Sequence, residues 1–489
     1  MDMHKIESFS SRFGLIAATL GMAIGAGNIW RFPRLAGQYG GSFIIPWLIF
    51  LFLWSIPLLM VEFSVGMKTR KGVLGAFKKA MGEKYTWMGW FVAFCTSAIM
   101  FYYSVVSGWA LKYFLLAVSS ELTTLNHEQF WTSYTTSYNE PVLFHFVSLA
   151  LAEILIYLGV VKGIERFSKI IIPTLYILLI ISAIKAISLS GSDVGLSYLF
   201  SFELQKLGDY KIWLDGLSQS AWSTGAGWGL VLTYAVYAKN KARITGNVFI
   251  TGIGNNFASI LAGLVIIPTI FALSPSTDVA SSALASGNQG LAFIAIPKLF
   301  SQMSAGGIFA IIFFMALFFA ALSSLISMLE LASRVMMDFG MDRKKAVIVI
   351  ALITAIVGTP SAISMDFFNN QDWVWGLGLI LSGLFFTLLV LKVGVTKFVD
   401  EWYQPQKYTT FTHLAFKVLF YVLLPLEFIA MLGWWFYQSV TRLPESSWDI
   451  FESFSLGTTL FQWIFILAIG IIFNKKINNW MSKTESKEN

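Results

Sequence analysis

Glycine and polar residues interrupt the first long apolar run of the 489-residue chain. The segment from Gly21 to Pro33 reads GMAIGAGNIWRFP, and it carries Asn28 and Arg31 where the flanking residues are apolar enough to lie in a membrane. Lipid offers no hydrogen-bond partner to a free backbone N–H or C=O group, so polar or helix-breaking residues at this depth are costly. The segment is therefore either a poorly packed helix or a helix that is broken for a functional reason.

Composition makes a membrane protein the expected class. Hydrophobic residues make up 56% of the chain and charged residues only 12%, far from the balance of a soluble domain. The apolar runs are continuous over about 20 residues, which predicts spanning helices rather than the shorter alternating strands of a barrel. The formal net charge of +7 lies in the loops, so an orientation bias explains it better than nucleic-acid binding, and no nucleic-acid partner is expected.

We predict twelve helical spans in an all-α polytopic membrane protein. They cover residues 12–38, 42–67, 87–118, 142–160, 168–189, 211–238, 244–273, 305–338, 345–363, 373–395, 412–438 and 452–474. Most Lys and Arg residues then lie on one side, which predicts cytoplasmic N and C termini. The single Cys95 lies in an apolar run, and the sequence has no N-x-S/T sequon and no cleavable signal, so we expect a bacterial inner membrane.

The loop at 274–304 is the longest between predicted spans, and its second half is apolar. Loops of this length are usually functional. We expect this one to fold down as an extracellular lid.

Span six contains a second glycine-rich interruption. It reads SQSAWSTGAGWG from Ser218 to Gly229 and places three glycines in mid-membrane. Five spans separate the two interruptions, and because five is odd, a repeat of spans one to five in spans six to ten must be inverted. The expected units are residues 1–190, residues 191–400 as the inverted second repeat, and residues 401–489 with peripheral spans eleven and twelve and a cytoplasmic tail.

The two interruptions together favour a binding site between discontinuous helices 1 and 6. One interruption alone would fit close helix packing equally well, because glycine is a common packing residue in membrane helices. Asn28 beside the first interruption, and Gln219 and Ser223 beside the second, shift the balance towards a site.

The motifs GAGNIWRFP and WSTGAGWG, the latter followed by TYAVY, resemble the neurotransmitter:sodium symporter family. Its bacterial amino-acid members include the bacterial leucine transporter, whose broken helices hold substrate and ions. The resemblance covers spans one to ten, and twelve spans is the usual number in the family. It implies transport by alternating access, coupled to sodium.

The resemblance implies two sodium sites. The first matches the Ala23 carbonyl with Asn28, Ser223 and Asn255, and the second matches the carbonyls of Gly21, Ile24 and Ala320 with the hydroxyls of Ser323 and Ser324. Freed carbonyls and hydroxyls suit a hard cation that has lost its water. Ser323 and Ser324 alone would fit equally well as helix hydroxyls bonded to their own backbone.

The resemblance also implies a substrate site between the breaks. Its carboxylate would lie on the N–H groups of Ala26 and Gly27 and on the Tyr103 hydroxyl, since helix N-termini favour an anion. Family members that carry biogenic amines look to have an aspartate where this chain has Gly25, and this aspartate replaces the carboxylate that an amine lacks. With glycine at this position, the expected substrate is an amino acid, which brings its own carboxylate.

The remaining implied pocket residues are mostly large and apolar: Met22, Ile99, Trp222, Gly225, Trp228, Ser324 and Met328. Such a pocket suits an aromatic or branched aliphatic L-amino acid. The alternative is that these side chains merely fill helix interfaces.

Charged residues match the gates of the family. Arg31 and Asp372 would close the site on the outside through water, with Trp222 beneath them. On the cytoplasmic side Tyr237 and Asp338 match, but the usual Arg and Trp of the tail fall at Ile6 and Phe9, which leaves Lys5 as the substitute. The other carboxylates within spans, Glu62 and Glu330, are interpreted as structural.

Chloride dependence is a further hypothesis. Gln219, Ser223, Asn255 and Ser259 match the chloride ligands of relatives, and Ser259 stands where sodium-only bacterial relatives tend to carry a carboxylate. A neutral site beside two sodium ions leaves positive charge that an anion would compensate. Trp47, which replaces the expected Tyr, counts against it.

The predicted function is sodium-coupled symport of a hydrophobic L-amino acid. The alternatives are a proton-coupled or uncoupled carrier on the same fold, or an amino-acid-sensing receptor, although the loops leave little room for a signalling domain. An enzyme is not expected, because the four His residues lie in tails, loops or span ends without metal-ligand spacing.

Overall fold

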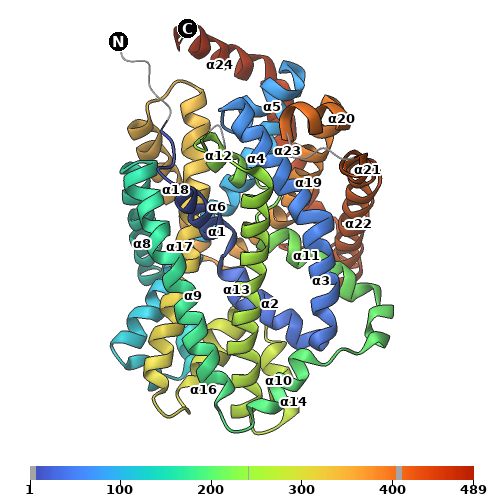
Figure 1. Cartoon of the computed structure of the whole chain (residues 1–489). Coiled ribbons are helices and arrows are strands. Elements are labelled where there is room, and N and C mark those ends of the chain that lie inside the picture. Colours follow the sequence, from blue (N-terminus) through green and yellow to red (C-terminus); the bar gives the residue numbers. More distant parts are fainter. Residues whose placement is uncertain (1–6, 240–241, 404–409, 489) are drawn as a thin grey trace.

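The computed structural model describes residues 7–239, 242–403 and 410–488, and every regular element within these ranges is helical. Most of the long helices run roughly along one axis, from the top to the bottom of Figure 1. Two of them, α6 (Thr86–Val118) and α17 (Gly306–Asp338), pack extensively on one another.

The other long helices surround this pair or lie at its edge. They are α4 (Ile56–Thr69), α8 (Asn139–Tyr157), α9 (Arg166–Ile187), α13 (Ile244–Leu273), α18 (Arg343–Ile363), α19 (Met365–Val393), α22 (Leu424–Arg442) and α23 (Leu456–Ile472). Within the described ranges, nine helical segments are long and apolar enough to cross a membrane, or ten if the bent pair Leu456–Ile472 and Asn474–Thr484 is one span. The chain is therefore a multi-pass helical membrane protein.

This count is lower than twelve for three reasons: half of the broken first span is joined to the second, the sixth is broken into short helices, and the twelfth, Leu456–Ile472, has only 17 residues. Residues Ala26–Thr69 count as one apolar helical segment. Within it, α2 (Ala26–Tyr39) and α3 (Ile44–Phe50) are separated by a turn, after which α3 and α4 run back towards α5 (Val73–Met81) (Figure 1). The number twelve stays a prediction.

The first predicted interruption is a break in the helix. Helix α1 (Arg12–Ala23) ends at Ile24, whose φ and ψ of −78° and 97° are extended, and α2 begins after Gly25. The two halves are therefore separate helices that meet at residues 24–25.

The second interruption is a wider break between α11 (Tyr210–Ser223) and α12 (Leu230–Val236). Gly225, Gly227 and Gly229 have φ of +68°, +88° and +81°, which side chains with a Cβ rarely adopt. Glu62 on α4 accepts hydrogen bonds from the N–H groups of Gly227 (2.7 Å) and Leu232 (3.2 Å). The carboxylate thus satisfies donors that the break leaves free.

Helix contacts follow a paired pattern. The second half of the first broken helix, α2, packs on α13, and the second half of the second broken helix, α12, packs on α4. Likewise α6 packs on α8 and α17 packs on α18. In the predicted numbering, the contact of span one with span seven matches that of span six with span two. The contact of span three with span four likewise matches that of span eight with span nine.

Several boundaries differ from the prediction. Helix α19 begins at Met365 rather than at 373, because the Ser364 side chain caps it by accepting from the Phe367 N–H at 3.2 Å. Helix α23 begins at Leu456 rather than 452, again after a serine cap, Ser455. Helix α24 (Asn474–Glu488) follows at a bend of 55°.

The predicted lid loop contains short helices instead of irregular chain. They are α14 (Thr277–Leu284), α15 (Gly287–Gly290) and α16 (Ile296–Phe300). Helix α14 packs on α2, where Leu284 fills the space that Gly37 leaves open. The remaining short helices are α7 (His127–Thr136), α10 (Ser192–Phe200), α20 (Val395–Lys397) and α21 (Thr410–Val418).

Candidate substrate and ion site

A cavity of about 240 Å³ lies between the two helix breaks. Ten of the eleven predicted substrate residues line it: Met22, Gly25, Gly27, Ile99, Tyr103, Trp222, Gly225, Trp228, Ser324 and Met328. The eleventh, Ala26, contributes its backbone N–H, which donates to the Tyr103 hydroxyl at 3.0 Å. The structure thus brings together residues from α1, α2, α6, α11, α17 and the second break.

Backbone N–H groups and hydroxyls form one end of the cavity. A Cβ on Gly25 would lie 2.9 Å from the Tyr103 hydroxyl and 3.1 Å from the Ser324 Oγ. The absence of a side chain at Gly25 therefore keeps two hydroxyl groups close to the N-terminus of α2. A helix N-terminus flanked by hydroxyl donors favours a carboxylate.

Apolar side chains form the other end. Trp222 and Trp228 meet edge to face, with ring centroids 6.4 Å apart, and Met22, Ile99 and Met328 lie around them on the cavity wall. Sequence reasoning missed several further lining residues, among them Tyr102, Val106, Leu230, Phe368 and Leu377. Helical spacing could have identified Tyr102 and Val106, which follow Ile99 at positions three and seven along α6.

The residues predicted for the first sodium site form one buried cluster. The Asn28 amide donates to Asn255 Oδ1 and to Ser259 Oγ, each at 2.8 Å, and the Asn255 amide donates to Ser223 Oγ at 3.1 Å. Asn255 Oδ1 also lies 3.1 Å from the Ala23 carbonyl oxygen and 2.8 Å from that of Ser223. Three acceptors this close repel one another unless a cation lies among them or the amide turns over. The oxygen set therefore fits a hard cation.

The residues predicted for the second sodium site also meet. Ser324 Oγ lies 3.3 Å from the Met22 carbonyl and 3.5 Å from the Ile24 carbonyl, so this hydroxyl crosses from α17 to the first break. Ser323 Oγ bonds the Ala320 carbonyl at 3.1 Å on its own helix. Gly21 faces Ser323, because a Cβ there would lie 3.3 Å from the Ser323 Cβ.

The candidate chloride ligands lie next to the first cluster. Ser223, Asn255 and Ser259 belong to its hydrogen-bond network. Both side-chain amide atoms of Gln219, and the indole Nε1 of Trp47, are buried with no hydrogen-bond partner among the described residues. That chloride binds among these residues stays a prediction.

The outer end of the cavity contains both predicted gate residues, Arg31 and Asp372. Arg31 donates to Ser218 Oγ at 2.7 Å and lies over the Trp222 ring, 5.2 Å from its centroid. Asp372 accepts a hydrogen bond from the Tyr102 hydroxyl. Each charge thus has a neutral partner of its own, and the gate residues share one cavity wall.

The lid loop contributes to this outer end. Asn288 and Gln289 of α15 line the cavity, and Arg34 Nε donates to Asn288 Oδ1 at 2.9 Å. The loop therefore touches α2 directly above the substrate region.

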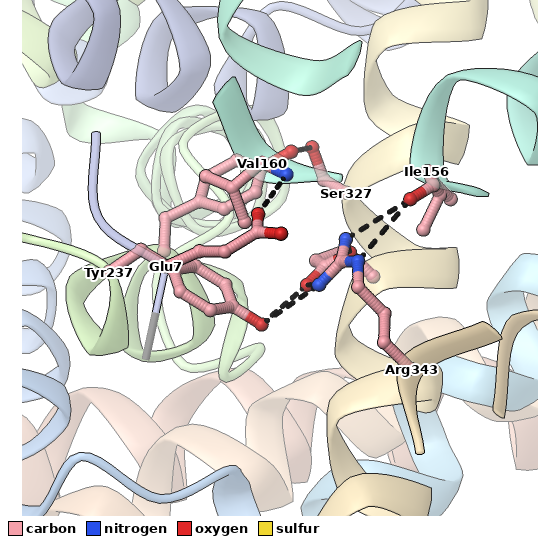
Figure 2. Close-up of polar contacts among 8 residues, drawn as sticks. Glu7, Ile156, Val160, Tyr237, Ser327 and Arg343 are labelled. Atoms are coloured by element: carbon pink, nitrogen blue, oxygen red, sulfur yellow. Dashed lines mark hydrogen bonds and ion pairs between the residues drawn. The ribbon is translucent and has the colours of Figure 1, made fainter. Parts of the chain in front are cut away.

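The predicted cytoplasmic gate residues, Tyr237 and Asp338, are both buried. The Tyr237 hydroxyl donates to Glu330 at 2.6 Å, and Glu330 forms a 2.5 Å ion pair with Arg343. Figure 2 shows the Arg343 guanidinium between the Tyr237 hydroxyl and the Ile156 carbonyl, and it donates to both. Asp338 lies 3.5 Å from Arg334. Glu330 is therefore a fully partnered carboxylate, as expected, but it belongs to the gate cluster.

An acid and a lysine both hold the N-terminal tail, and Lys239 Nζ donates to the Ser10 carbonyl at 2.7 Å. Glu165 accepts from the Ser10 N–H (2.7 Å), the Ser10 hydroxyl (2.6 Å) and the Ser11 hydroxyl (3.0 Å). Glu7 accepts from the Val160 N–H at 2.6 Å (Figure 2). The predicted tail cation, Lys5, lies outside the described residues. No pattern of spacing pointed to Glu165, which is far from the tail in sequence.

Comparisons with known proteins agree with this geometry. Residues 6–144 and 144–430 match the model of the sodium:neurotransmitter symporter family. A sodium-dependent transporter of Methanocaldococcus jannaschii is 31% identical over 73% of this chain and 75% of its own length. The sodium-dependent transporter YhdH of Bacillus subtilis is 28% identical over 81% and 90%.

A solved structure has a similar fold. The crystal structure of MhsT in complex with L-phenylalanine matches with a TM-score of 0.76 and 28% sequence identity. The match covers 87% of this chain and 99% of the MhsT chain. The family model covers well over half of the chain, and the members of this family are transporters rather than enzymes. The chain therefore belongs to the sodium:neurotransmitter symporter family.

Proposed function

We propose that this protein carries a hydrophobic L-amino acid, aromatic or branched aliphatic, across the membrane together with sodium, by alternating access. One observation carries the proposal: two breaks in helices far apart in sequence face one cavity with a polar end and an apolar end. Discontinuous helices that expose backbone dipoles at mid-membrane are typical of substrate and ion sites in secondary transporters.

The polar end would hold the amino-acid backbone. Its carboxylate would accept from the N–H groups of Ala26 and Gly27 and from the Tyr103 hydroxyl, while Ser324 lies opposite. The apolar end, with two Trp and two Met side chains, would hold the substrate side chain. The L-phenylalanine in the MhsT structure supports a large hydrophobic substrate.

Two sodium ions would bind beside the substrate. The first would lie among the Ala23 and Ser223 carbonyls, Asn28 and Asn255, and the second between the first break and α17, at Gly21, Ile24, Ala320, Ser323 and Ser324. Because the first ion would share the substrate's carboxylate, each ligand would raise the affinity for the other. A proton-coupled or uncoupled carrier, and an amino-acid receptor, remain the alternatives.

Chloride would occupy the neighbouring donor set, Gln219, Ser223, Asn255 and Ser259. The buried, unpartnered amide of Gln219 favours this part of the proposal, whereas Trp47 in place of the expected Tyr counts against it. Uptake that is unchanged when gluconate replaces chloride would rule it out.

The wider arrangement follows the family pattern. We propose twelve spans with an inverted repeat of residues 1–190 and 191–400, peripheral residues 401–489, and both termini in the cytoplasm of a bacterial cell. The paired contacts of α2 with α13 and of α12 with α4 support the repeat.

The test is an uptake competition screen in proteoliposomes with all common L-amino acids, each with and without a sodium gradient. Large hydrophobic amino acids should compete only in sodium. Asn28→Ala should abolish sodium-dependent uptake, because it removes a side chain that holds Asn255 and Ser259. A mutant with normal uptake and unchanged sodium dependence would refute the assignment, and binding without flux would favour the receptor.

A further inference from the structure

Four polar residues follow one face of α13 at four-residue intervals. They are Asn247, Thr251, Asn255 and Ser259, and each is at most 2% exposed. Polar side chains in a membrane helix are costly unless they serve a partner or a water-filled path. The rest of α13 is strongly apolar, so this line of residues needs an explanation.

Each residue of the line bonds the first broken helix. Arg12 Nε donates to Asn247 Oδ1 at 3.2 Å, and the hydroxyls of Thr19 and Thr251 lie 2.8 Å apart. Asn28 reaches the last two, Asn255 and Ser259. We call the part formed by Arg12, Thr19, Asn247 and Thr251 the α1–α13 seam.

The seam connects the first ion cluster to the predicted cytoplasmic end of the bundle. Thr251 lies one helical turn from Asn255, and Asn247 lies one turn further, beside the exposed Arg12. The line is therefore continuous from the cluster to the end of α1 that carries the tail.

If these contacts only held the two helices together, every buried hydrogen-bond donor among them should have a protein acceptor. In this region two buried amide groups have none among the described residues. Asn247 Nδ2, and Asn256 Nδ2 next to the cluster, are buried with no hydrogen-bond partner among the described residues. Buried donors of this kind are normally satisfied by water. The side of α1 that faces α9 is different, because there Gly21 meets the apolar Ile172.

Helix α1 is short enough to move as a unit, because it has only 12 residues and is separated from α2 at Ile24–Gly25. In this structure the bonds of Glu165 to Ser10 and Ser11 hold it docked. Outward movement of α1 would remove Arg12 and Thr19 and would leave the polar face of α13 open to water.

We propose that the α1–α13 seam is the route by which the sodium ion of the first cluster reaches the cytoplasm, with the hydroxyl of Thr251 as its intermediate ligand once Thr19 has moved away with α1. The inference rests on the proposed sodium coupling. Arg12 at the mouth repels cations while α1 is docked, so the route opens only when α1 leaves.

Cysteine accessibility tests the route in the full chain, reconstituted in liposomes. The native Cys95 is buried, so the wild-type chain supplies the background. In sodium-free buffer, Thr251→Cys should react with a membrane-impermeant cationic methanethiosulfonate about tenfold faster than Thr354→Cys, and sodium should slow it. Thr354 is the matched control, because it is equally buried and bonds its own helix at Ile350. Equal rates for the two variants would overturn the proposal.

Transport kinetics supply a second readout. Thr251→Val keeps the shape and removes the hydroxyl, so the maximal uptake rate should fall about fivefold, the factor that one lost hydrogen bond gives. The sodium concentration for half-maximal substrate binding should stay the same, and Thr354→Val should match the wild type. Unchanged rates, or a parallel loss of sodium affinity, would overturn the route. Absence of sodium-dependent binding in the wild type would instead defeat the proposed function.

Discussion

Gly25 lies between the hydroxyl groups of two side chains from different helices. A Cβ at this position would come within 2.9 Å of the Tyr103 hydroxyl and 3.1 Å of the Ser324 Oγ. Contacts this short force one neighbour to move, at a cost of about 1–3 kcal/mol. The glycine therefore holds together the proposed carboxylate site and the Ser324 contact with the first break.

Gly25→Ala should lower substrate affinity about tenfold, the factor that corresponds to 1.4 kcal/mol. The measurement is equilibrium binding of a labelled amino acid in sodium buffer. Gly433→Ala on α22 is the control, since a Cβ there meets no atom within 4 Å and should leave binding unchanged. An affinity equal to that of the wild type in Gly25→Ala would contradict this reading of the site.

His127 on α7 is a buried histidine that we expect to make the folded protein sensitive to acid. Burial, and then the positive charge of Lys298 on α16, lower the pKa of His127 below its ordinary value, and both ring nitrogens lack a hydrogen-bond partner among the described residues. The folded state therefore binds this proton less readily than the unfolded state, so stability is lost as the pH falls below the ordinary pKa of about 6.5.

The melting temperature should consequently fall by a few degrees between pH 7.5 and pH 5. His127→Gln cannot titrate, and its melting temperature should fall less over the same range. Thermal unfolding in detergent at both pH values measures the difference between the two proteins. Identical pH profiles would show that His127 has no part in the acid response.

At the scale of elements, the second break depends on Glu62. Its two carboxylate oxygens accept from Gly227 and Leu232, which lie on either side of the start of α12. Glutamine has only one acceptor oxygen, and its amide group would face N–H donors. A buried donor left unsatisfied costs about 1–3 kcal/mol.

Glu62→Gln should therefore lower the free energy of unfolding by about 2 kcal/mol. Glu153 on α8 offers a matched comparison, because it is also buried but neither of its carboxyl oxygens has a partner among the described residues. Glu153→Gln should be neutral or stabilising, since it removes an uncompensated carboxyl. Melting curves of the two variants should separate clearly, and equal losses would argue against the capping role of Glu62.

The breaks were predictable from sequence because their signal is local. Gly225, Gly227 and Gly229 all have positive φ, and glycine is the residue that adopts it without strain. The cap of α19 was also local, since Ser364 precedes the helix, but the predicted start ignored it. The helices inside the lid loop were missed because they are too short to give a clear periodic pattern.

The gate clusters were not predictable from sequence for a different reason. Glu330 meets Arg343 because α17 turns into α18, and Glu165 meets Ser10 because α9 lies beside α1. Such pairs depend on how distant helices pack, which charge patterns along one chain do not encode. Tyr237 bonds Glu330 and Asp338 lies beside Arg334, and the role of Tyr237 and Asp338 as a gate stays a prediction.

At the scale of the whole molecule, substrate and sodium should stabilise the folded protein only together. The cavity, the first ion cluster and the second break share residues, since Ser223 belongs to the cluster and also lines the cavity. A ligand that binds only the folded state at about 100 times its Kd adds about 2.7 kcal/mol of stability. The carboxylate of a bound amino acid would lie next to the first sodium ion, so neither ligand should reach this affinity alone.

L-Phenylalanine should accordingly raise the melting temperature in detergent by about 2 °C or more in sodium chloride and not in potassium chloride. Asn28→Ala should lose this shift, because it disrupts the cluster with Asn255 and Ser259, whereas Gly433→Ala should keep it. Differential scanning fluorimetry over a sodium series gives the coupling between the two ligands directly. A shift of the same size in both salts would show that substrate binding does not depend on sodium, and the proton-coupled or uncoupled carrier would then be the better description.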